Sequence, residues 1–160
     1  MIFITSYHSP DIDGVACCIG YSELLSKLGT KAETTYFGDL SREVEFVKRY
    51  TNFFPLKKHS GEYPEDAEFV LVDTADPDAI ETTIPPERVK EIFKKNNLGP
   101  SQKVAVYLYS AIISNTVNFK NSVTAQRDIN AANWLKPISQ VGDDYIRKMF
   151  EYKSKIRDAW

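Results

Sequence analysis

The start of the chain joins three short patterns in an order that few folds accommodate. Ile2–Thr5 is an apolar, β-branched run, which is typical of a strand buried on both faces. Pro10 then ends strand pairing, and two aspartates, Asp11 and Asp13, follow at once. Across residues 15–25, apolar or small side chains recur at helical spacing. A strand, an acidic loop and a helix predict the first unit of an α/β fold, in which ligands bind at the carboxyl ends of the strands.

The acidic loop allows two interpretations. Two carboxylates one residue apart, with His8 beside them, suit a hard divalent cation such as Mg²⁺, and an imidazole ligand shifts the preference towards Mn²⁺. Asp11 and Asp13 are also common turn formers, and either could cap the helix that begins near Gly14. The residues alone leave both interpretations open, so His8, Asp11 and Asp13 are candidate metal ligands.

The composition is that of one ordinary globular domain, which we take as 1–160. The 160 residues are 42% hydrophobic and 26% charged. The net charge is −2, whereas proteins that bind duplex nucleic acid usually carry an excess of positive charge. No apolar run approaches the ~20 residues of a membrane helix, and the first residues lack the basic region of a secretory signal. We therefore expect neither a duplex nucleic acid nor a membrane as a partner.

The two cysteines, Cys17 and Cys18, are adjacent inside the first helical pattern. Neighbouring helical residues point about 100° apart, so a disulfide between these two is implausible. Two cysteines are also too few for a zinc site with four cysteine ligands. Buried, reduced thiols predict a cytoplasmic protein.

Two further strands follow the first unit. The predicted strands are Ile2–Ser6, Ala32–Phe37 and Phe69–Asp73, and Phe69–Val72 is the clearest run for a strand buried inside the sheet. Helical patterns are predicted at 41–50, 87–96, 101–113, 124–135 and 143–159. Strands and helices in this order predict a three-layer α/β fold, with a mainly parallel sheet flanked by helices.

Asp73 closes the third predicted strand. A carboxylate at the tip of a buried parallel strand is where an α/β enzyme places a metal ligand. The competing interpretation is an Asx turn that ends the strand. We favour the metal, because Asp73 directly follows four apolar residues and can point across the sheet towards Asp11 and Asp13. The three carboxylates are expected to converge on one pocket.

Three segments, taken in order, resemble a known family. They are SYHSPDIDG at Ser6–Gly14, LVDT at Leu71–Thr74 and SAIISNTVNFK at Ser110–Lys120, and the similarity continues through 124–135. Together they resemble the Asp-His-His (DHH) phosphoesterase superfamily. Within it, the chain is most similar to the amino-terminal domain of the manganese-dependent family II inorganic pyrophosphatases. The resemblance covers most of the chain and implies a DHH-domain-like fold.

The resemblance also implies a metal-dependent phosphohydrolase. Asp11 and Asp13 would each bind one of two metal ions and Asp73 would bridge them, with Mn²⁺ or Mg²⁺ as the cofactor. A metal-activated water would attack phosphorus in a small phosphate-containing substrate, either pyrophosphate or a phosphodiester. Asn115 and Lys120 lie in the third matching segment and are candidate ligand-binding residues. We also consider that two copies of this chain assemble as a homodimer.

The sequence departs from the family's pattern at its metal ligands. Tyr7 stands where the family has a histidine, and His8 is one position late. Asn115 replaces the aspartate of the family's Ser-Asp-Thr. The Asp-His-His signature is absent, which indicates a missing segment near 88–96, and we expect a single domain without the family's second, substrate-binding domain. Because these ligands are lost, we expect a weakened hydrolase.

Two other functions stay open. A catalytically degenerate domain that binds phosphate or a partner without turnover would account for the lost ligands. A haloacid-dehalogenase-like phosphatase would account for DIDGV at 11–15 and for the acidic residues at 142–144. In that class, however, the first aspartate follows its strand directly, whereas residues 6–10 intervene here.

Overall fold

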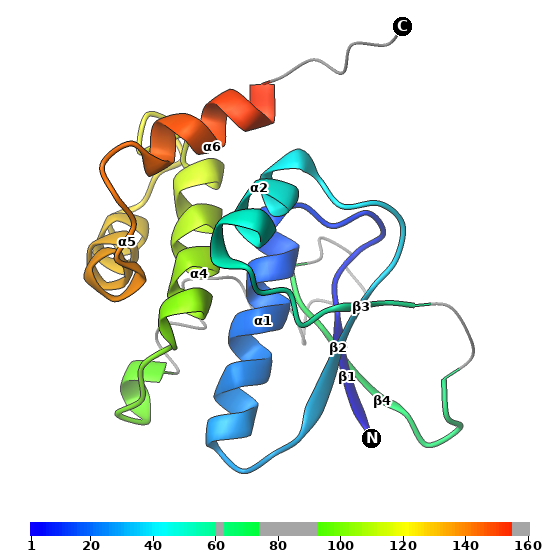
Figure 1. Cartoon of the computed structure of the whole chain (residues 1–160). Coiled ribbons are helices and arrows are strands. Elements are labelled where there is room, and N and C mark those ends of the chain that lie inside the picture. Colours follow the sequence, from blue (N-terminus) through cyan, green and yellow to red (C-terminus); the bar gives the residue numbers. More distant parts are fainter. Residues whose placement is uncertain (60–62, 74–92, 155–160) are drawn as a thin grey trace, which may run out of the picture.

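The computed structural model describes residues 1–59, 63–73 and 93–154 (Figure 1). At its centre is a parallel sheet with the strand order β3-β2-β1-β4. The strands are β1 (Ile2–Thr5), β2 (Ala32–Tyr36), β3 (Lys57–Lys58) and β4 (Glu68–Leu71). β1 pairs with β2 on one side and with β4 on the other, so Ile4 lies opposite both Thr34 and Val70. Parallel pairing brings the carboxyl ends of these strands to one end of the sheet.

The described helices lie on one side of this sheet (Figure 1). They are α1 (Ile12–Lys27), α2 (Arg42–Thr51), α4 (Gln102–Asn115), α5 (Gln126–Ser139) and α6 (Tyr145–Ser154). α1 packs against β1 and β2, α4 packs against α1, and α5 packs against α4. The helices therefore build outward from one face of the sheet. Within the described residues, no helix combines the length and the apolarity that crossing a bilayer requires.

The core lies between the sheet and α4. Ile4 of β1 and Val15 of α1 form one buried cluster with Leu108 and Ile112 of α4. The buried run in α4 is unbroken over residues 104–114, because this helix contacts α1, α2, α5 and α6. α4 is therefore the centre of the helical layers.

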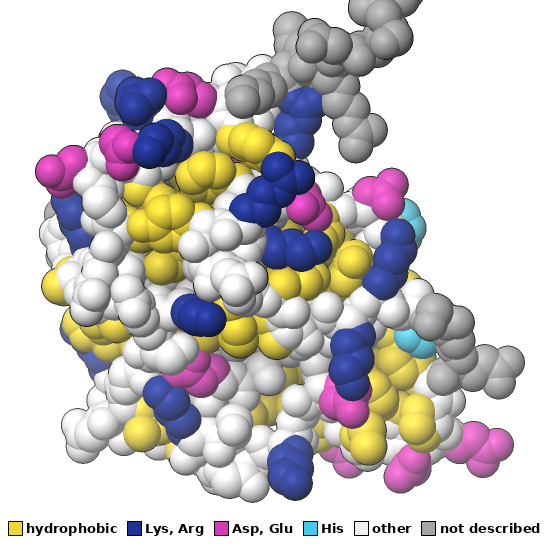
Figure 2. Space-filling model, in the orientation of Figure 1, with side chains coloured by type: hydrophobic (Ala, Val, Ile, Leu, Met, Phe, Trp, Pro, Cys, Tyr) yellow, Lys and Arg dark blue, Asp and Glu magenta, His cyan; other side chains and the backbone are white. Residues whose placement is uncertain are grey.

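An aromatic cluster joins α2 to α6. The ring of Phe46 lies 5.4 Å from the ring of Tyr145 and 5.8 Å from that of Tyr152, and Tyr50 meets Tyr145 edge-on at 4.7 Å. On the face shown in Figure 2, apolar side chains gather around these two helices, while basic and acidic side chains are interspersed elsewhere. Aromatic packing thus fixes α6 on the outside of the domain.

The structure confirms the predicted α/β class, with a parallel sheet flanked by helices. β1, β2 and α2 lie where the sequence places them, and Cys17 and Cys18 are buried and form no disulfide with each other. α5 extends further than predicted, to Ser139. Most of the helix predicted at 87–96, and the end of the one predicted at 143–159, fall outside the described residues.

The prediction that Phe69–Val72 is buried inside the sheet is wrong for the described strands. β4 pairs only with β1 among them, and Phe69 is 44% exposed. The Phe69 ring stacks on Phe3 and meets Tyr63 edge-on at 4.6 Å. A short apolar run does not reveal how much of a strand is covered, since a strand whose exposed ring packs in an aromatic cluster has the same pattern.

Candidate functional site

The loop between β1 and α1 places two carboxylates at the carboxyl end of the sheet. Asp11 is the N-cap of α1, and its Oδ1 accepts hydrogen bonds from the backbone N–H groups of Asp13 at 3.0 Å and Gly14 at 3.3 Å. Asp13 lies in the first turn of α1 and is 8% exposed. The capping interpretation of Asp11 is therefore confirmed.

Gly14 allows α1 to begin close to the end of β1. A Cβ at this position would lie 2.5 Å from Ser6 Oγ and 3.3 Å from Pro10 Cβ. A glycine is therefore required after the two aspartates, because Ser6 and Pro10 lie too close to this position to admit a side chain. It keeps both carboxylates near the strand end.

Asp73 follows β4 and lies near the same loop. Burial raises the pKa of the Tyr7 hydroxyl, and a side-chain hydrogen bond to Asp11 and the charges of Asp11 and Asp73 also raise it. Burial raises the pKa of the Cys18 thiol as well, and the charge of Asp73 adds to that shift. The Val72 N–H donates to the Thr5 carbonyl at 2.9 Å, so Asp73 follows β4 beside the end of β1, where the acidic loop begins.

His8 lies against the turn that follows β2. Its Nδ1 is 3.1 Å from Ser9 Oγ, and the Ser9 hydroxyl oxygen accepts a hydrogen bond from the Asp39 N–H, also at 3.1 Å. The Ser9 N–H donates to the carbonyl of Phe37 at 2.9 Å. A Cβ at Gly38 would lie only 2.6 Å from His8 Cε1. These contacts hold the exposed imidazole at the end of β2.

Asn115 and Lys120 flank an unusual turn after α4. Val117, Asn118 and Phe119 have φ values of 50°, 54° and 63°, in the left-handed region that favours glycine. Three such residues in succession are strained, and backbone strain is concentrated at functional sites. This end of α4 lies at the same end of the molecule as the start of α1 (Figure 1). A ligand-binding role for Asn115 and Lys120 stays a prediction.

The described residues do not fit a closed two-metal site. They include His8, Asp11, Asp13 and Asp73, yet none of them forms a group of three or more His, Cys, Asp or Glu side chains that could hold a metal ion. Oδ1 of Asp11 is used in the helix cap, and His8 lies against Gly38. The assignment of these four residues as metal ligands stays a prediction.

A buried polar cluster beside Asn115 escaped sequence reasoning. Glu43 of α2 is 6% exposed; its Oε1 accepts a hydrogen bond from Ser114 Oγ of α4 and forms an ion pair with Lys153 Nζ of α6 at 2.8 Å. Lys153 Nζ also lies 2.9 Å from Ser114 Oγ. Helical spacing could have indicated it, because Glu43 lies four residues before the buried Val47. The cluster fixes the carboxyl end of α4.

The chain is similar to known proteins in sequence and in fold. No family model matches the chain. A probable manganese-dependent inorganic pyrophosphatase of Clostridium acetobutylicum is 25% identical over 189 residues, which cover 98% of this chain and 61% of that protein. The chain therefore spans about three-fifths of the length of this relative.

Two solved structures share the fold. A Methanococcus jannaschii protein assigned to the family II inorganic pyrophosphatases superposes with a TM-score of 0.78 at 22% identity, over 96% of this chain and 62% of that one. An exopolyphosphatase-related protein from Bacteroides fragilis gives a TM-score of 0.59 at 16% identity, over 98% of this chain and 57% of that one.

The chain is an α/β domain that shares the fold of these two solved structures. The comparisons confirm the resemblance to the manganese-dependent family II pyrophosphatases, in keeping with the DHH superfamily.

Proposed function

We propose that this chain is a phosphoesterase-like domain that uses Mn²⁺ or Mg²⁺ to hydrolyse a small phosphate compound, pyrophosphate or a phosphodiester, at a reduced rate. The observation that carries the proposal is the acidic loop. Asp11 and Asp13 follow the carboxyl end of β1, and Asp73 follows Val72, whose N–H donates to the carbonyl of Thr5 at that same strand end at 2.9 Å. Similarity to a manganese-dependent pyrophosphatase over 98% of the chain supports the choice of metal and substrate.

The reduced rate follows from the ligands that this chain lacks. Tyr7 and Asn115 stand where the family has a histidine and an aspartate, and neither side chain is a strong metal ligand at neutral pH. The alignment with the Clostridium relative is 189 residues long, whereas this chain has 160. The relative therefore carries residues inside the matched region that this chain lacks, in keeping with a missing segment, for which we propose the position near 88–96.

The second candidate function is binding without turnover. It is favoured by the lack of a metal-holding group among the described residues. A haloacid-dehalogenase-like phosphatase gains no support, because β1 ends at Thr5 and Asp11 caps α1 instead of following the strand. A homodimer and a cytoplasmic location stay predictions, the first of which light scattering would test.

The two candidates separate in a titration with Mn²⁺ followed by an assay of phosphate release. Slow release of phosphate from pyrophosphate that depends on Mn²⁺ and falls in Asp13→Asn would support the weakened hydrolase. Binding of Mn²⁺ and pyrophosphate without release would favour the binding domain. Failure to bind either would contradict both. Glu65→Gln, an exposed carboxylate outside the loop, is the matched control.

A further inference from the structure

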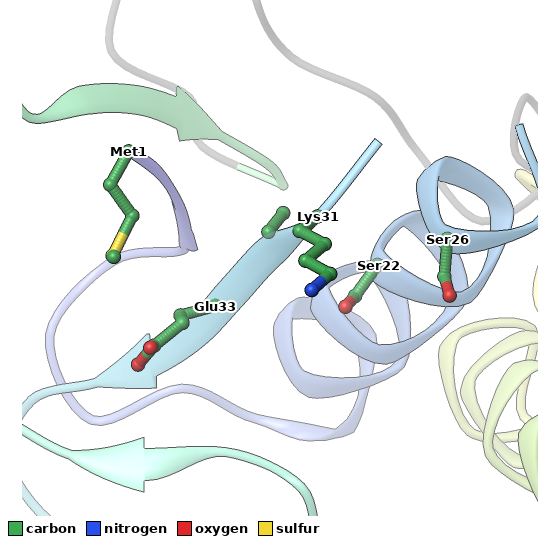
Figure 3. Close-up of a pocket in the computed structure, with 6 residues that line it drawn as sticks. Met1, Ser22, Ser26, Lys31 and Glu33 are labelled. Carbon is green, nitrogen blue, oxygen red and sulfur yellow. The ribbon is translucent and has the colours of Figure 1, made fainter. Parts of the chain in front are cut away.

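A cavity lies at the amino ends of β1 and β2, at the opposite end of the sheet from the acidic loop. Its volume is about 340 Å³, within the range of small-molecule sites. Its lining residues are Met1, Ser22, Ser26, Lys31, Ala32 and Glu33 (Figure 3). None of them belongs to the segments that resemble the pyrophosphatases.

Three hydrogen-bond donors meet in this cavity. Figure 3 shows the Lys31 side chain reaching from the start of β2 towards Ser22 of α1. Ser26 follows Ser22 by four residues, which is one turn further along the same side of α1. Within the part of the chain that the structure describes, the side chains of these three residues form no hydrogen bond or ion pair. No other described side chain occupies these donors, which leaves them for a ligand.

The charges around the cavity favour an anion. Glu33 also lines it, but its carboxylate pairs with Lys57 at 2.9 Å. Lys27, one turn beyond Glu23 on α1, pairs with that residue at 2.8 Å. Among the described residues that line the cavity, Lys31 is therefore the charged side chain without an ion-pair partner. An ammonium and two hydroxyls match the oxygens of a carboxylate or a phosphate.

We propose that this cavity binds a small organic anion, with a carboxylate or phosphate head on Lys31, Ser22 and Ser26. The apolar part of the ligand lies on Met1 and Ala32, which supply the apolar wall. The site is separate from the acidic loop, so it goes beyond the proposed phosphoesterase function and does not depend on it.

The test uses two probes that share one ring, benzoate and phenyl phosphate. Each is titrated against the full chain in EDTA, and binding is followed by NMR shifts of backbone amides. We expect shifts within 22–33, and the tighter probe identifies the head group. Lys31→Met should weaken binding at least about tenfold, the loss of one charge-assisted hydrogen bond. Lys31→Arg should retain most of the affinity.

Two control variants show whether binding is specific to this cavity. Lys95→Met removes an exposed lysine elsewhere and should leave binding unchanged. Asp13→Asn alters the acidic loop and should also leave it unchanged. The proposal is overturned if neither probe shifts any amide at about 10 mM, if Lys95→Met weakens binding as much as Lys31→Met, or if the shifts are confined to residues 7–14. None of these outcomes bears on pyrophosphate hydrolysis.

Discussion

Single residues at the carboxyl end of the sheet decide where the loop after β1 lies. Gly38 has a φ of +73°, and a Cβ there would lie 2.2 Å from Ser9 Oγ. Gly29 has a φ of +85°, and a Cβ there would have nothing within 4 Å. The two glycines therefore share a backbone requirement, while only Gly38 also requires the absence of a side chain.

We expect Gly38→Ala to lower the free energy of unfolding by more than Gly29→Ala does. Both substitutions carry the cost of alanine in the left-handed region, roughly 1–2 kcal/mol. Only Gly38→Ala must also displace Ser9 and His8. Urea unfolding of both variants measures the difference. Equal losses would contradict the observed contact between the His8–Ser9 segment and the turn after β2.

Restoring the family's ligand types should strengthen metal binding. The double variant Tyr7→His, Asn115→Asp is expected to bind Mn²⁺ at least about tenfold more tightly than the natural chain, because it supplies an imidazole and a carboxylate. Titration followed by electron paramagnetic resonance of free Mn²⁺ measures the affinity. The control, Tyr7→Phe with Asn118→Asp, adds the same charge without the ligands. Equal affinities in both variants would place the metal elsewhere.

Residue types in the sequence identified Asp11 but not its role. Its carboxylate fitted both a cap and a metal ligand, and only the hydrogen bonds to Asp13 and Gly14 show that it caps α1. Helical spacing could have indicated that Glu43 is buried, but not its partners Ser114 and Lys153, which lie on helices far away in the sequence. A local sequence pattern indicates which roles a side chain could have. The contacts in the folded structure show which of those roles it has.

At the scale of helices and strands, hydrophobic periodicity located most elements to within a few residues. It succeeded for α2, whose buried Val44 and Val47 are separated by charged positions. It failed for β4, because the exposed ring of Phe69 packs with Phe3 and Tyr63 instead of entering a covered core. A strand's neighbours are a property of the sheet, so its own residues do not reveal them.

The polar cluster of Glu43, Ser114 and Lys153 should stabilise the packing of α2, α4 and α6. Glu43→Gln is expected to lower the free energy of unfolding by about 1–3 kcal/mol, because it removes a charged acceptor that is buried. Glu45→Gln is the matched control in the same turn of α2, and its 3.6 Å pair with Lys48 is worth at most about 0.5 kcal/mol. Denaturant unfolding compares the two. Similar small losses would show that the cluster contributes little.

At the scale of the whole molecule, buried tyrosines make stability depend on alkaline pH. Burial raises the pKa of Tyr107 to about 12, and it raises the pKa of Tyr109 and of Tyr145 as well. The unfolded chain therefore releases these protons first, near pH 10. Their contribution is fully present below about pH 10 and is lost as the pH rises through the folded-state values.

We accordingly expect the free energy of unfolding to fall between pH 10 and about 12. Tyr107→Phe should flatten this decline, although it also loses the hydrogen bond to the Phe53 carbonyl at 2.7 Å. Urea unfolding at a series of pH values measures the slope. A decline equally steep in Tyr107→Phe would assign the pH dependence to other groups.

For the molecule as a whole, the likeness to a solved family II pyrophosphatase structure lies in the fold. The sheet and α1 superpose on a solved structure over 96% of the chain, but the described residues contain no metal-holding group. Fold could be predicted because it depends on many apolar positions that tolerate exchange. Activity depends on a few ligands at fixed positions, so the same degree of resemblance predicts it far less well.

The most direct test is the steady-state rate of pyrophosphate hydrolysis in Mn²⁺, assayed beside a manganese-dependent pyrophosphatase under the same conditions. We expect a rate at least about 100-fold lower, since the loss of metal ligands weakens both metal binding and turnover. The remaining rate should vanish in Asp73→Ala and persist in Glu65→Gln. A rate comparable to that of the reference enzyme would contradict the proposal that this domain is a weakened hydrolase.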